Sequence, residues 1–462
     1  MRSAPATRGE CRADGATQQY IIHRSAAISI VAAAMPKMRA TRNPVGAFRM
    51  TREISLAALA GALVGLACAE PPTTGARFPV LDDLGDGEWA AVSTGRDHTC
   101  ALTRDGRAFC WGSNDAGQLL AHDGGPEVCQ VVSSVAPRAC AAAPVAVLPN
   151  VRFLAISSGG THTCAIAVDR AMSCWGDNGS GQLGDAAPPR GLVRVPGSLG
   201  FASVSAGSTH TCAVRTDGAL LCWGRNDRGQ LGTGDKVASS LPVRVASNLT
   251  FASVSAGDGR TCARTTASVV YCWGAIWLYR QNGLEFTRDQ TTPERVLGAP
   301  ALASVSVGSF TTCGADGVGV VYCWEANPYG EMGTGNTNGS TAPVQVASPA
   351  RFAMVSAGII QTCAVAVTGA GYCWGNNTFG QLGVSPATLP ERCVDSVSSC
   401  ATRPMAVYGR QQFVSISTGF GNHSCGVSTR GNLYCWGLGW IGQLGDGQAS
   451  YRETIPVLVE LP

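Results

Sequence analysis

The residues of this chain whose type and spacing could do chemistry are its cysteines. Fourteen of the 20 form seven pairs in which the second cysteine stands ten residues after the first. Paired thiols form disulfides or hold a metal. Zinc ligands come in pairs two to four residues apart, and the sequence contains no CxxC, so disulfides are favoured. The pairs are Cys100–Cys110, Cys164–Cys174, Cys212–Cys222, Cys262–Cys272, Cys313–Cys323, Cys363–Cys373 and Cys425–Cys435.

Each pair flanks a turn between two stretches of β-forming residues, as in THTCALTRDGRAFCWG. A three-residue loop at 104–106 would pair residue n with residue 210 − n and set Cys100 opposite Cys110. Glycine would then hold the left-handed third position, and Gly218, Gly319, Gly369 and Gly431 share the offset of Gly106. Opposed residues on antiparallel strands lie close enough for a disulfide. We therefore predict a cross-strand disulfide in every hairpin, worth about 2–3 kcal/mol each.

The remaining cysteines complete this pattern. Cys129 can pair with Cys140, and Cys393 with Cys400, within two insertions. Only Cys11 and Cys68, both near the N-terminus, are then left over. A fully paired set of cysteines indicates an oxidising compartment.

The cysteine pairs belong to an internal repeat, of which residues 201–245 are one copy. Seven copies follow one another in steps of 64, 48, 50, 51, 50 and 62 residues. Each contains four strand-like stretches (FASVSAG, HTCAV, ALLCWG and PVRV), with a glycine turn at 229–232 from which Leu231 packs inward. One such sheet cannot bury its faces alone, whereas radial packing can. We predict an all-β, seven-bladed propeller of four-stranded blades over residues 79–462.

The two ends of the repeat region bear on how the ring closes. The region begins with Pro79-Val80 and ends with Pro456-Val457, both resembling the fourth strand of a blade. We expect one of them to complete a blade started at the other terminus.

Composition excludes several classes of protein. The 462 residues are 45% hydrophobic, so the chain is not disordered throughout. No apolar run reaches the roughly 20 residues of a membrane-spanning helix. Residues 1–68 carry nine Lys and Arg against three Asp and Glu, while the rest carries 25 against 28 and is mildly acidic. A body of that charge argues against nucleic-acid binding.

The N-terminal region predicts export. Residues 54–67 (ISLAALAGALVGLA) are an apolar run of the length of a secretory signal, preceded by Arg52. Residues 65–68 (GLAC) resemble a bacterial lipobox, although Gly65 replaces its usual aliphatic residue, so Cys68 is a candidate for lipidation. We divide the region into a leader or misassigned start at 1–49, a signal at 50–68 and a tether at 69–78. The alternative is a buried apolar helix. A lipid chain would anchor the protein without spanning the membrane.

The pattern HTCAL…DG…CWGxN…GQLG resembles the repeat of the regulator of chromosome condensation family, in its cysteine-bearing, secreted bacterial form. The resemblance covers residues 79–462 and implies a seven-bladed propeller. Trp-Gly follows the second cysteine in six copies, while the fifth has Trp324-Glu325. GQLG recurs at 181–184, 229–232, 380–383 and 442–445. It is altered to GEMG at 330–333 and GQLL at 117–120, and the fourth copy lacks it.

Histidine and tryptophan also recur with the repeat. His98, His162, His210 and His423 stand two residues before the first cysteine, where the other copies have Arg260, Thr311 and Gln361. A ring of metal ligands or bases would not survive those replacements. We predict instead a repeated hydrogen bond from each side chain to the backbone inside its own blade. The repeated tryptophan is assigned to blade packing, with carbohydrate stacking as the alternative.

In a repeat protein the informative residues are those that break the repeat. Insertions at 121–143 and 384–403 should emerge on one face, flanking blades seven and one, and the first contains the isolated His122. In copy four, residues 275–287 replace the glycine turn and bring four side chains of the types that are common in protein interfaces. We take these four and His122 as candidate partner-binding residues. The alternative is neutral loop variation. The four are Trp277, Tyr279, Arg280 and Phe286.

The sequence contains no P-loop, paired-carboxylate or catalytic-triad signature, so no catalytic, cofactor or metal residue is assigned. We predict a non-enzymatic, monomeric lipoprotein of the cell envelope that binds an unidentified protein. One alternative is inhibition of an extracellular enzyme, as in similar propellers that inhibit β-lactamases. The family resemblance also implies guanine-nucleotide exchange, and a lyase or glycosidase in the central funnel would require clustered carboxylates on one rim.

Overall fold

The computed structural model describes residues 8–13, 16–21, 89–120, 127–129, 138–186, 190–196, 200–280, 283–389, 391–393 and 398–462. The chain divides into two compact units, Met1–Gly75 and Ala76–Pro462. In the first, the described residues form one hairpin, β1 (Arg8–Ala13) with β2 (Ala16–Ile21). The predicted signal and Cys68 lie outside the described residues. Within the described ranges, no helix has the length and hydropathy needed to cross a membrane.

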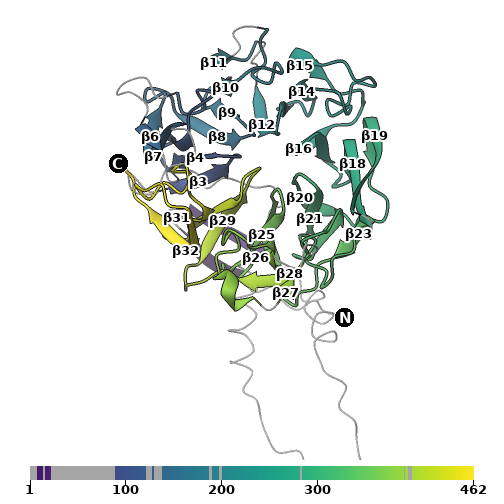
Figure 1. Cartoon of the computed structure of the whole chain (residues 1–462). Helices are drawn as coiled ribbons and strands as arrows, with labels where there is room; N and C mark the ends of the chain where they lie inside the picture. The colour runs from purple at the N-terminus through teal and green to yellow at the C-terminus, as the bar shows by residue number, and fades with distance from the viewer. Residues whose placement is uncertain are drawn as a thin grey trace, which may run out of the picture. The chain divides into compact units, whose positions relative to one another are not determined.

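The described part of the second unit forms seven antiparallel sheets, which are the blades of a ring (Figure 1). Blade one contains β3 (Trp89–Thr94), β4 (His98–Thr103), β5 (Ala108–Ser113), β7 (Arg138–Val147) and the edge strand β6 (Glu127–Cys129). Blade two contains β8 (Phe153–Ser158), β9 (His162–Ala167), β10 (Met172–Asp177) and β11 (Arg190–Arg194). Blade three contains β12 (Phe201–Ala206), β13 (His210–Arg215), β14 (Leu220–Gly224) and β15 (Ser239–Arg244).

The remaining blades continue in chain order. Blade four contains β16 (Phe251–Ala256), β17 (Arg260–Thr265), β18 (Val270–Arg280) and β19 (Gly283–Arg295). Blade five contains β20 (Leu302–Val307), β21 (Thr311–Asp316), β22 (Val321–Glu325) and β23 (Ser340–Gln345). Blade six contains β24 (Phe352–Ala357), β25 (Gln361–Ala366), β26 (Gly371–Asn376), η2 (Pro386–Thr388), β27 (Glu391–Arg392) and β28 (Ser399–Ala406). Blade seven contains β29 (Phe413–Thr418), β30 (His423–Ser428), β31 (Leu433–Leu438) and β32 (Arg452–Val459).

The central hairpin of each blade has the predicted register. Leu102 pairs with Ala108 and Cys100 with Cys110, so residue n does face residue 210 − n. Gly106, in the third loop position, has φ +81°. Two blades lack this glycine, yet Arg170 and Ser268 hold the same position at φ +66° and +62°. The turn geometry is therefore kept in those blades by a backbone conformation that side chains seldom adopt.

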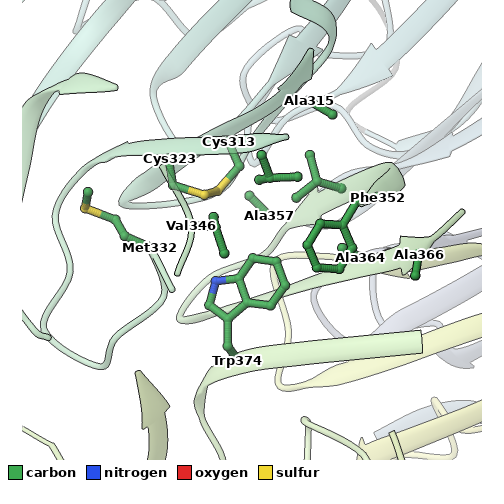
Figure 2. Close-up of a cluster of buried hydrophobic side chains, with 12 residues drawn as sticks. Cys313, Ala315, Cys323, Met332, Val346, Phe352, Ala357, Ala364, Ala366 and Trp374 are labelled. Atoms are coloured by element: carbon green, nitrogen blue, oxygen red, sulfur yellow. A yellow bond between two sulfur atoms is a disulfide. The ribbon is translucent and has the colours of Figure 1, made fainter. Parts of the chain in front are cut away.

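The disulfides lie in the core between blades. All nine predicted bonds are formed, and the seven hairpin pairs have Cα–Cα distances of 4.0–4.1 Å. Figure 2 shows one such core, where Cys313–Cys323 of blade five packs beside Phe352 and Trp374 of blade six. Each of the other six joins likewise sets the disulfide of one blade against the tryptophan of the next. A single stacking unit is thus repeated around the ring.

Among the described strands the ring closes without exchange, so the expected composite blade is wrong for the C-terminal segment. Pro456-Val457 lies in β32, which pairs with β31 of its own blade. Pro79-Val80 lies outside the described residues. Blade one contacts blade seven through β3, β29 and β30 in the same manner as the other neighbours. The backbone N–H of Trp89 donates to Gly431 O at 3.0 Å, and its Nε1 donates to Val459 O at 3.3 Å.

Candidate functional site

The repeated histidines are structural links between blades. The Nε2 atoms of His98, His162 and His210 each lie 2.9 Å from a threonine Oγ1 of the next blade. His423 makes the same contact with Thr99, across the join between blades seven and one. The predicted bond to the backbone inside each blade is wrong, because the side chain reaches a neighbour that lies about one repeat away in the sequence.

Proton positions on these histidines follow from their partners. The hydroxyls of Thr99, Thr211 and Thr261 donate their only proton to a glutamine carbonyl of the preceding blade. The imidazole Nε2 that faces each must therefore be the donor, which leaves Nδ1 unprotonated. Burial lowers the pKa of His98 and His210 to about 4, and of His162 and His423 to about 3. Neutral, fully buried imidazoles of this kind support the blades rather than bind substrate.

The tryptophans and GQLG turns form a second set of links. Trp223 is fully buried, and its Nε1 donates at 2.9 Å to the carbonyl of Gln182 in the preceding blade. Five other blades repeat this bond at 2.8–3.0 Å. Leu231 of the turn is fully buried, as predicted. Because the indoles are buried, their faces cannot stack on carbohydrate, and the assignment to packing holds.

A ring of serines, which the sequence analysis did not identify, lines the centre. Each first strand carries a serine whose Oγ accepts the backbone N–H of the next blade's first strand at 2.8–3.1 Å. The seven are Ser93, Ser157, Ser205, Ser255, Ser306, Ser356 and Ser417. The serine that recurs in the FASVSAG stretch of each copy could have indicated this ring. The central cavity of about 110 Å³ has no acidic side chain among its described lining residues.

Blades four and five depart from these rules together. Arg260 fills the histidine position, and its Nη2 lies 2.7 Å from Oε1 of Glu325, which fills the glycine position after Trp324. Both side chains are buried. Thr312 donates to Oε2 of Glu325 at 2.8 Å, which replaces the glutamine carbonyl lost with the GQLG turn of blade four. Glu325 adopts φ +88°, the glycine conformation of the other blades. The three departures therefore compensate one another.

The lost turn is replaced by a long hairpin. β18 and β19 contain 11 and 13 residues, and Trp277 pairs with Phe286 along them. Beside this hairpin is a cleft of about 200 Å³ lined by three consecutive blades. Blade three contributes Arg225, Asp227 and Arg228, blade four contributes Asp258 and Trp277, and blade five contributes Phe310. We call this the blade-four cleft.

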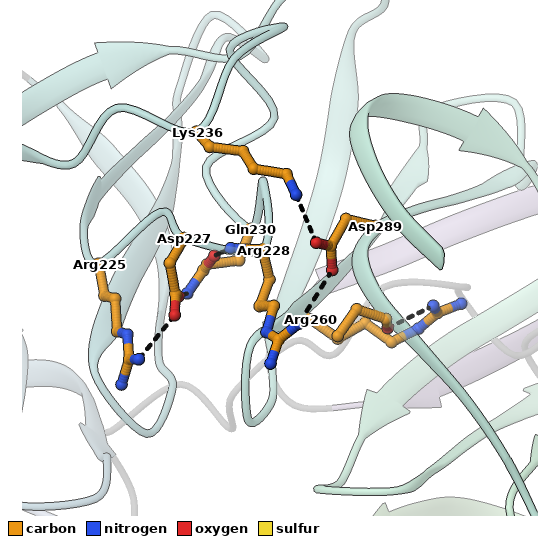
Figure 3. A network of polar contacts seen from close by, with 8 residues as sticks. Arg225, Asp227, Arg228, Gln230, Lys236, Arg260 and Asp289 are labelled. Carbon is orange, nitrogen blue, oxygen red and sulfur yellow. Dashed lines mark hydrogen bonds and ion pairs between the residues drawn. The ribbon is translucent and has the colours of Figure 1, made fainter. Parts of the chain in front are cut away.

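Aromatic and charged groups are held in fixed positions at the cleft. Trp277 and Phe310 meet edge to face with ring centres 6.4 Å apart. The guanidinium carbon of Arg228 lies 5.9 Å from the centre of the Trp277 ring. Arg228 also lies 3.9 Å from Asp289, and Lys236 lies 2.5 Å from the same carboxylate (Figure 3). A cation over an indole face and an edge-to-face pair are both favourable arrangements.

Asp227 keeps its negative charge at the rim of the cleft. Burial alone would raise its pKa, but hydrogen bonds from Arg225 and Gln230 hold the pKa below its usual value. The Arg225 Nη2 atom lies 2.6 Å from this carboxylate (Figure 3). Arg260 contacts the wall of the cleft, since its Nη1 donates at 3.0 Å to the carbonyl of Ala275, a lining residue. The buried Arg260–Glu325 pair thus supports the wall of the cleft.

The candidate partner-binding residues have different outcomes. Trp277 lines the blade-four cleft. Tyr279 and Arg280 lie near the end of β18, and Phe286 lies in β19, but their side chains are outside the described part of the structure. His122 also lies outside the described residues. Phe310 and Arg228 were missed, because only the fold brings blades three and five beside the hairpin.

Both insertions join the third and fourth strands of their blades and reach blade seven. Cys129 and Cys140 pack against Ile441. In the second insertion, Leu389 belongs to the core that contains Trp436 of blade seven. The backbone of Thr402 in the same insertion accepts a hydrogen bond from Gly335 of blade five. The described residues hold no group of three or more His, Cys, Asp or Glu that could bind a metal ion.

Comparison with known proteins agrees with this architecture. The RCC1-like domain matches residues 130–462, and the regulator of chromosome condensation (RCC1) repeat matches residues 89–118. The probable E3 ubiquitin-protein ligase HERC6 of Homo sapiens is 39% identical over 100 residues, which are 22% of this chain and 9% of that protein. Alsin of Homo sapiens is 32% identical over 99 residues, 21% of this chain and 6% of its own length. These relatives are therefore far longer than the matched segment.

Solved structures show the same fold at low identity. Prp20p from Saccharomyces cerevisiae, described with its binding properties to Gsp1p and histones, superposes with a TM-score of 0.64 and 18% identity, covering 82% of this chain and 87% of that one. Human WBSCR16 superposes with a TM-score of 0.59 and 19% identity, covering 73% and 86%. These superpositions establish the fold of the ring, and at such low sequence identity they establish the fold alone.

Proposed function

The chain belongs to the family of RCC1-like domains, and on that premise we propose that it is an exported, lipid-anchored, non-enzymatic scaffold that binds a protein partner. The observation that carries the proposal is the blade-four cleft. It lies where three repeat rules are broken at once, by the loss of GQLG, by Arg260 and by Glu325. The Arg260–Glu325 pair accounts for the packing between these blades, but it does not account for Trp277 and Phe310 at the cleft.

Export is supported by where the disulfides lie. The seven hairpin disulfides are buried in the cores between blades, one at every join of the ring. Disulfides persist in oxidising compartments and are uncommon in the cytosol. We place the protein in the cell envelope, held by a lipid on Cys68. Intact mass spectrometry of the mature protein should show Cys68 as the first residue with an acyl mass, and a mature chain that retains residues 1–67 would contradict the anchor.

Protein binding is supported by the chemistry of the cleft. Tryptophan, phenylalanine and arginine are the residue types that dominate binding energy at protein interfaces. Trp277 already contacts both Phe310 and Arg228, so little conformational freedom is lost when a partner docks. Arg225 and Arg228 are paired with Asp227 and Asp289, which suits a partner with an apolar side chain at the centre and polar groups at the rim.

The test is cross-linking in intact cell envelopes followed by quantification of the captured protein. We expect Trp277→Ala and Phe310→Ala each to lower capture by about tenfold or more, since hot-spot truncations cost about 2 kcal/mol or more. Phe379→Ala is the matched control, because Phe379 makes a similar edge-to-face contact with Tyr451 away from the cleft. Equal loss in the control, or no loss in either cleft variant, refutes the proposal.

The identified partner then distinguishes the remaining functions. If the captured protein is a secreted hydrolase, titration of its activity separates an inhibitor from a passive scaffold. Prp20p is described with binding to Gsp1p; acceleration of nucleotide release from a GTPase by this chain would replace the scaffold with an exchange factor. Neither outcome changes the assignment of the cleft as the binding surface.

A further inference from the structure

A second site lies where the linker between β28 and β29 meets the hairpin turn of β30 and β31. This pocket of about 430 Å³ is larger than the blade-four cleft and belongs to blade seven. Its lining contains two arginines and six neutral polar side chains, with no acid among the described residues. The lining residues are Arg410, Gln411, Gln412, Ser428, Thr429, Arg430, Asn432 and Tyr434.

The turn of blade seven breaks the repeat in its charge. In blades one and three, the residue before the turn glycine is an aspartate that pairs with a nearby arginine, at 2.8 Å for Asp105–Arg107 and 3.4 Å for Asp217–Arg215. Blade seven has Arg430 in that position. Neither Arg430 nor Arg410 forms an ion pair with an acidic residue in the described ranges. Two cations therefore face one pocket without a counter-charge.

The backbone around this pocket is fixed on both sides. The N–H of Thr429 donates to Gln412 O at 2.8 Å, and the carbonyl of Gly431 accepts Trp89 N–H at the join with blade one. Gly409 adopts φ +108°, a backbone conformation that residues with a side chain seldom adopt, and the end of the Gln411 side chain packs against it. The Oε1 atom of Gln411 is buried and has no hydrogen-bond donor among the described residues. The pocket thus combines two arginines with neutral polar side chains on a hydrogen-bonded backbone.

We propose that the blade-seven pocket binds an acidic sugar, which is a ligand that carries one carboxylate or phosphate and several hydroxyls. Guanidinium groups bind carboxylates and phosphates through paired hydrogen bonds. The side-chain amides and hydroxyls of the lining match the alternating donors and acceptors of sugar hydroxyls. The ring of Tyr434, held edge to face against Phe413, supplies an apolar surface at the wall. This site is independent of the blade-four cleft and of its proposed partner.

The test measures binding of glucuronic acid, glucose 6-phosphate and glucose to the full chain by calorimetry at low salt. We expect one or both acids to bind at least about tenfold more tightly than glucose, because only the acids can form charge-assisted hydrogen bonds with the two guanidinium groups. A preference between the acids identifies carboxylate or phosphate as the recognised group. Equal binding of glucose, or no binding of either acid, overturns the proposal.

Variants separate the pocket from general surface charge. The double variant R410A/R430A should weaken acid binding by at least about tenfold, while Arg244→Ala, an exposed arginine at the end of β15, should change it by less than about twofold. Arg430→Asp restores the aspartate of blades one and three, so it should fold normally and abolish acid binding. Retention of binding in both pocket variants, or an equal loss in Arg244→Ala, overturns the proposal.

Discussion

Replacing Arg260 by histidine and Glu325 by glycine, singly and together, tests whether blades four and five depart from the repeat as one coupled unit. Each change restores the residue found in most other blades. Glu325→Gly leaves the buried Arg260 without its partner 2.7 Å away, while Arg260→His removes the cation beside Glu325, whose pKa burial raises to about 7. Removing one member of a buried ion pair costs about 3–5 kcal/mol.

The double variant should recover most of that loss. Glu325→Gly also relieves a left-handed backbone, worth about 1–2 kcal/mol, so this single variant should lose slightly less than Arg260→His. In the double variant no charge is buried, and Thr312 can donate to the new imidazole. We expect its free energy of unfolding to lie within about 2 kcal/mol of the parent, which makes the coupling energy about 3 kcal/mol or more.

The assay is urea unfolding with intact disulfides, followed by tryptophan fluorescence, for the parent and the three variants. The matched control is the half-buried pair Asp105–Arg107, for which Asp105→Asn and Arg107→Ala should show a coupling of about 0–1 kcal/mol. If the destabilisation of the double variant equals the sum of the two single losses, the residues act independently. The account of their joint replacement would then be refuted.

Four further predictions concern the ring. Burial raises the pKa of Glu331 to about 8, above its usual 4.5, so its stabilising contribution is complete below pH 4.5 and is lost as pH rises towards 8. The urea midpoint of Glu331→Gln should therefore rise relative to that of the parent protein as the pH increases across that range. The four buried histidines, with lowered pKa values, should make every variant lose stability as pH falls from 6.5 towards 4. Removing the disulfide in Cys212→Ala/Cys222→Ala should cost about 2–3 kcal/mol in the same unfolding assay, and no change would contradict the chain-entropy argument. Ser205→Ala leaves the N–H of Ala256 without its 2.9 Å partner and should cost about 1–3 kcal/mol, with faster hydrogen exchange at that amide as the direct readout.

Features set within one hairpin could be predicted from the sequence. The ten-residue cysteine spacing and Gly106 led to the register, the turn and the disulfide, because all three depend on residues close together in the chain. The burial of Leu231 followed from its turn in the same way.

Features that join blades could be predicted only in part. The partner of His162 is Thr211, 49 residues away, and local spacing gives no account of such a contact. Arg260 and Glu325 were each noted as departures, but their pairing depends on how neighbouring blades face one another. The blade-four cleft was anticipated at Trp277 alone, since Arg228 and Phe310 reach it through the packing of three blades. The closure through β32 could not be read from the terminal Pro-Val dipeptides.

The join between blades seven and one has a consequence for chain connectivity. At this join the Thr94 N–H donates to Ser417 Oγ and the Trp89 N–H donates to Gly431 O, as at the other six joins, and no peptide bond links the described strands across it. The packing of the blades therefore does not depend on the join at which the polypeptide enters the ring. A circular permutant that links Val459 to Trp89 through a short flexible segment, and opens instead between β19 and β20, retains every blade and every disulfide. The gap between Val459 and Trp89 is therefore one of several structurally equivalent positions at which the ring can be opened.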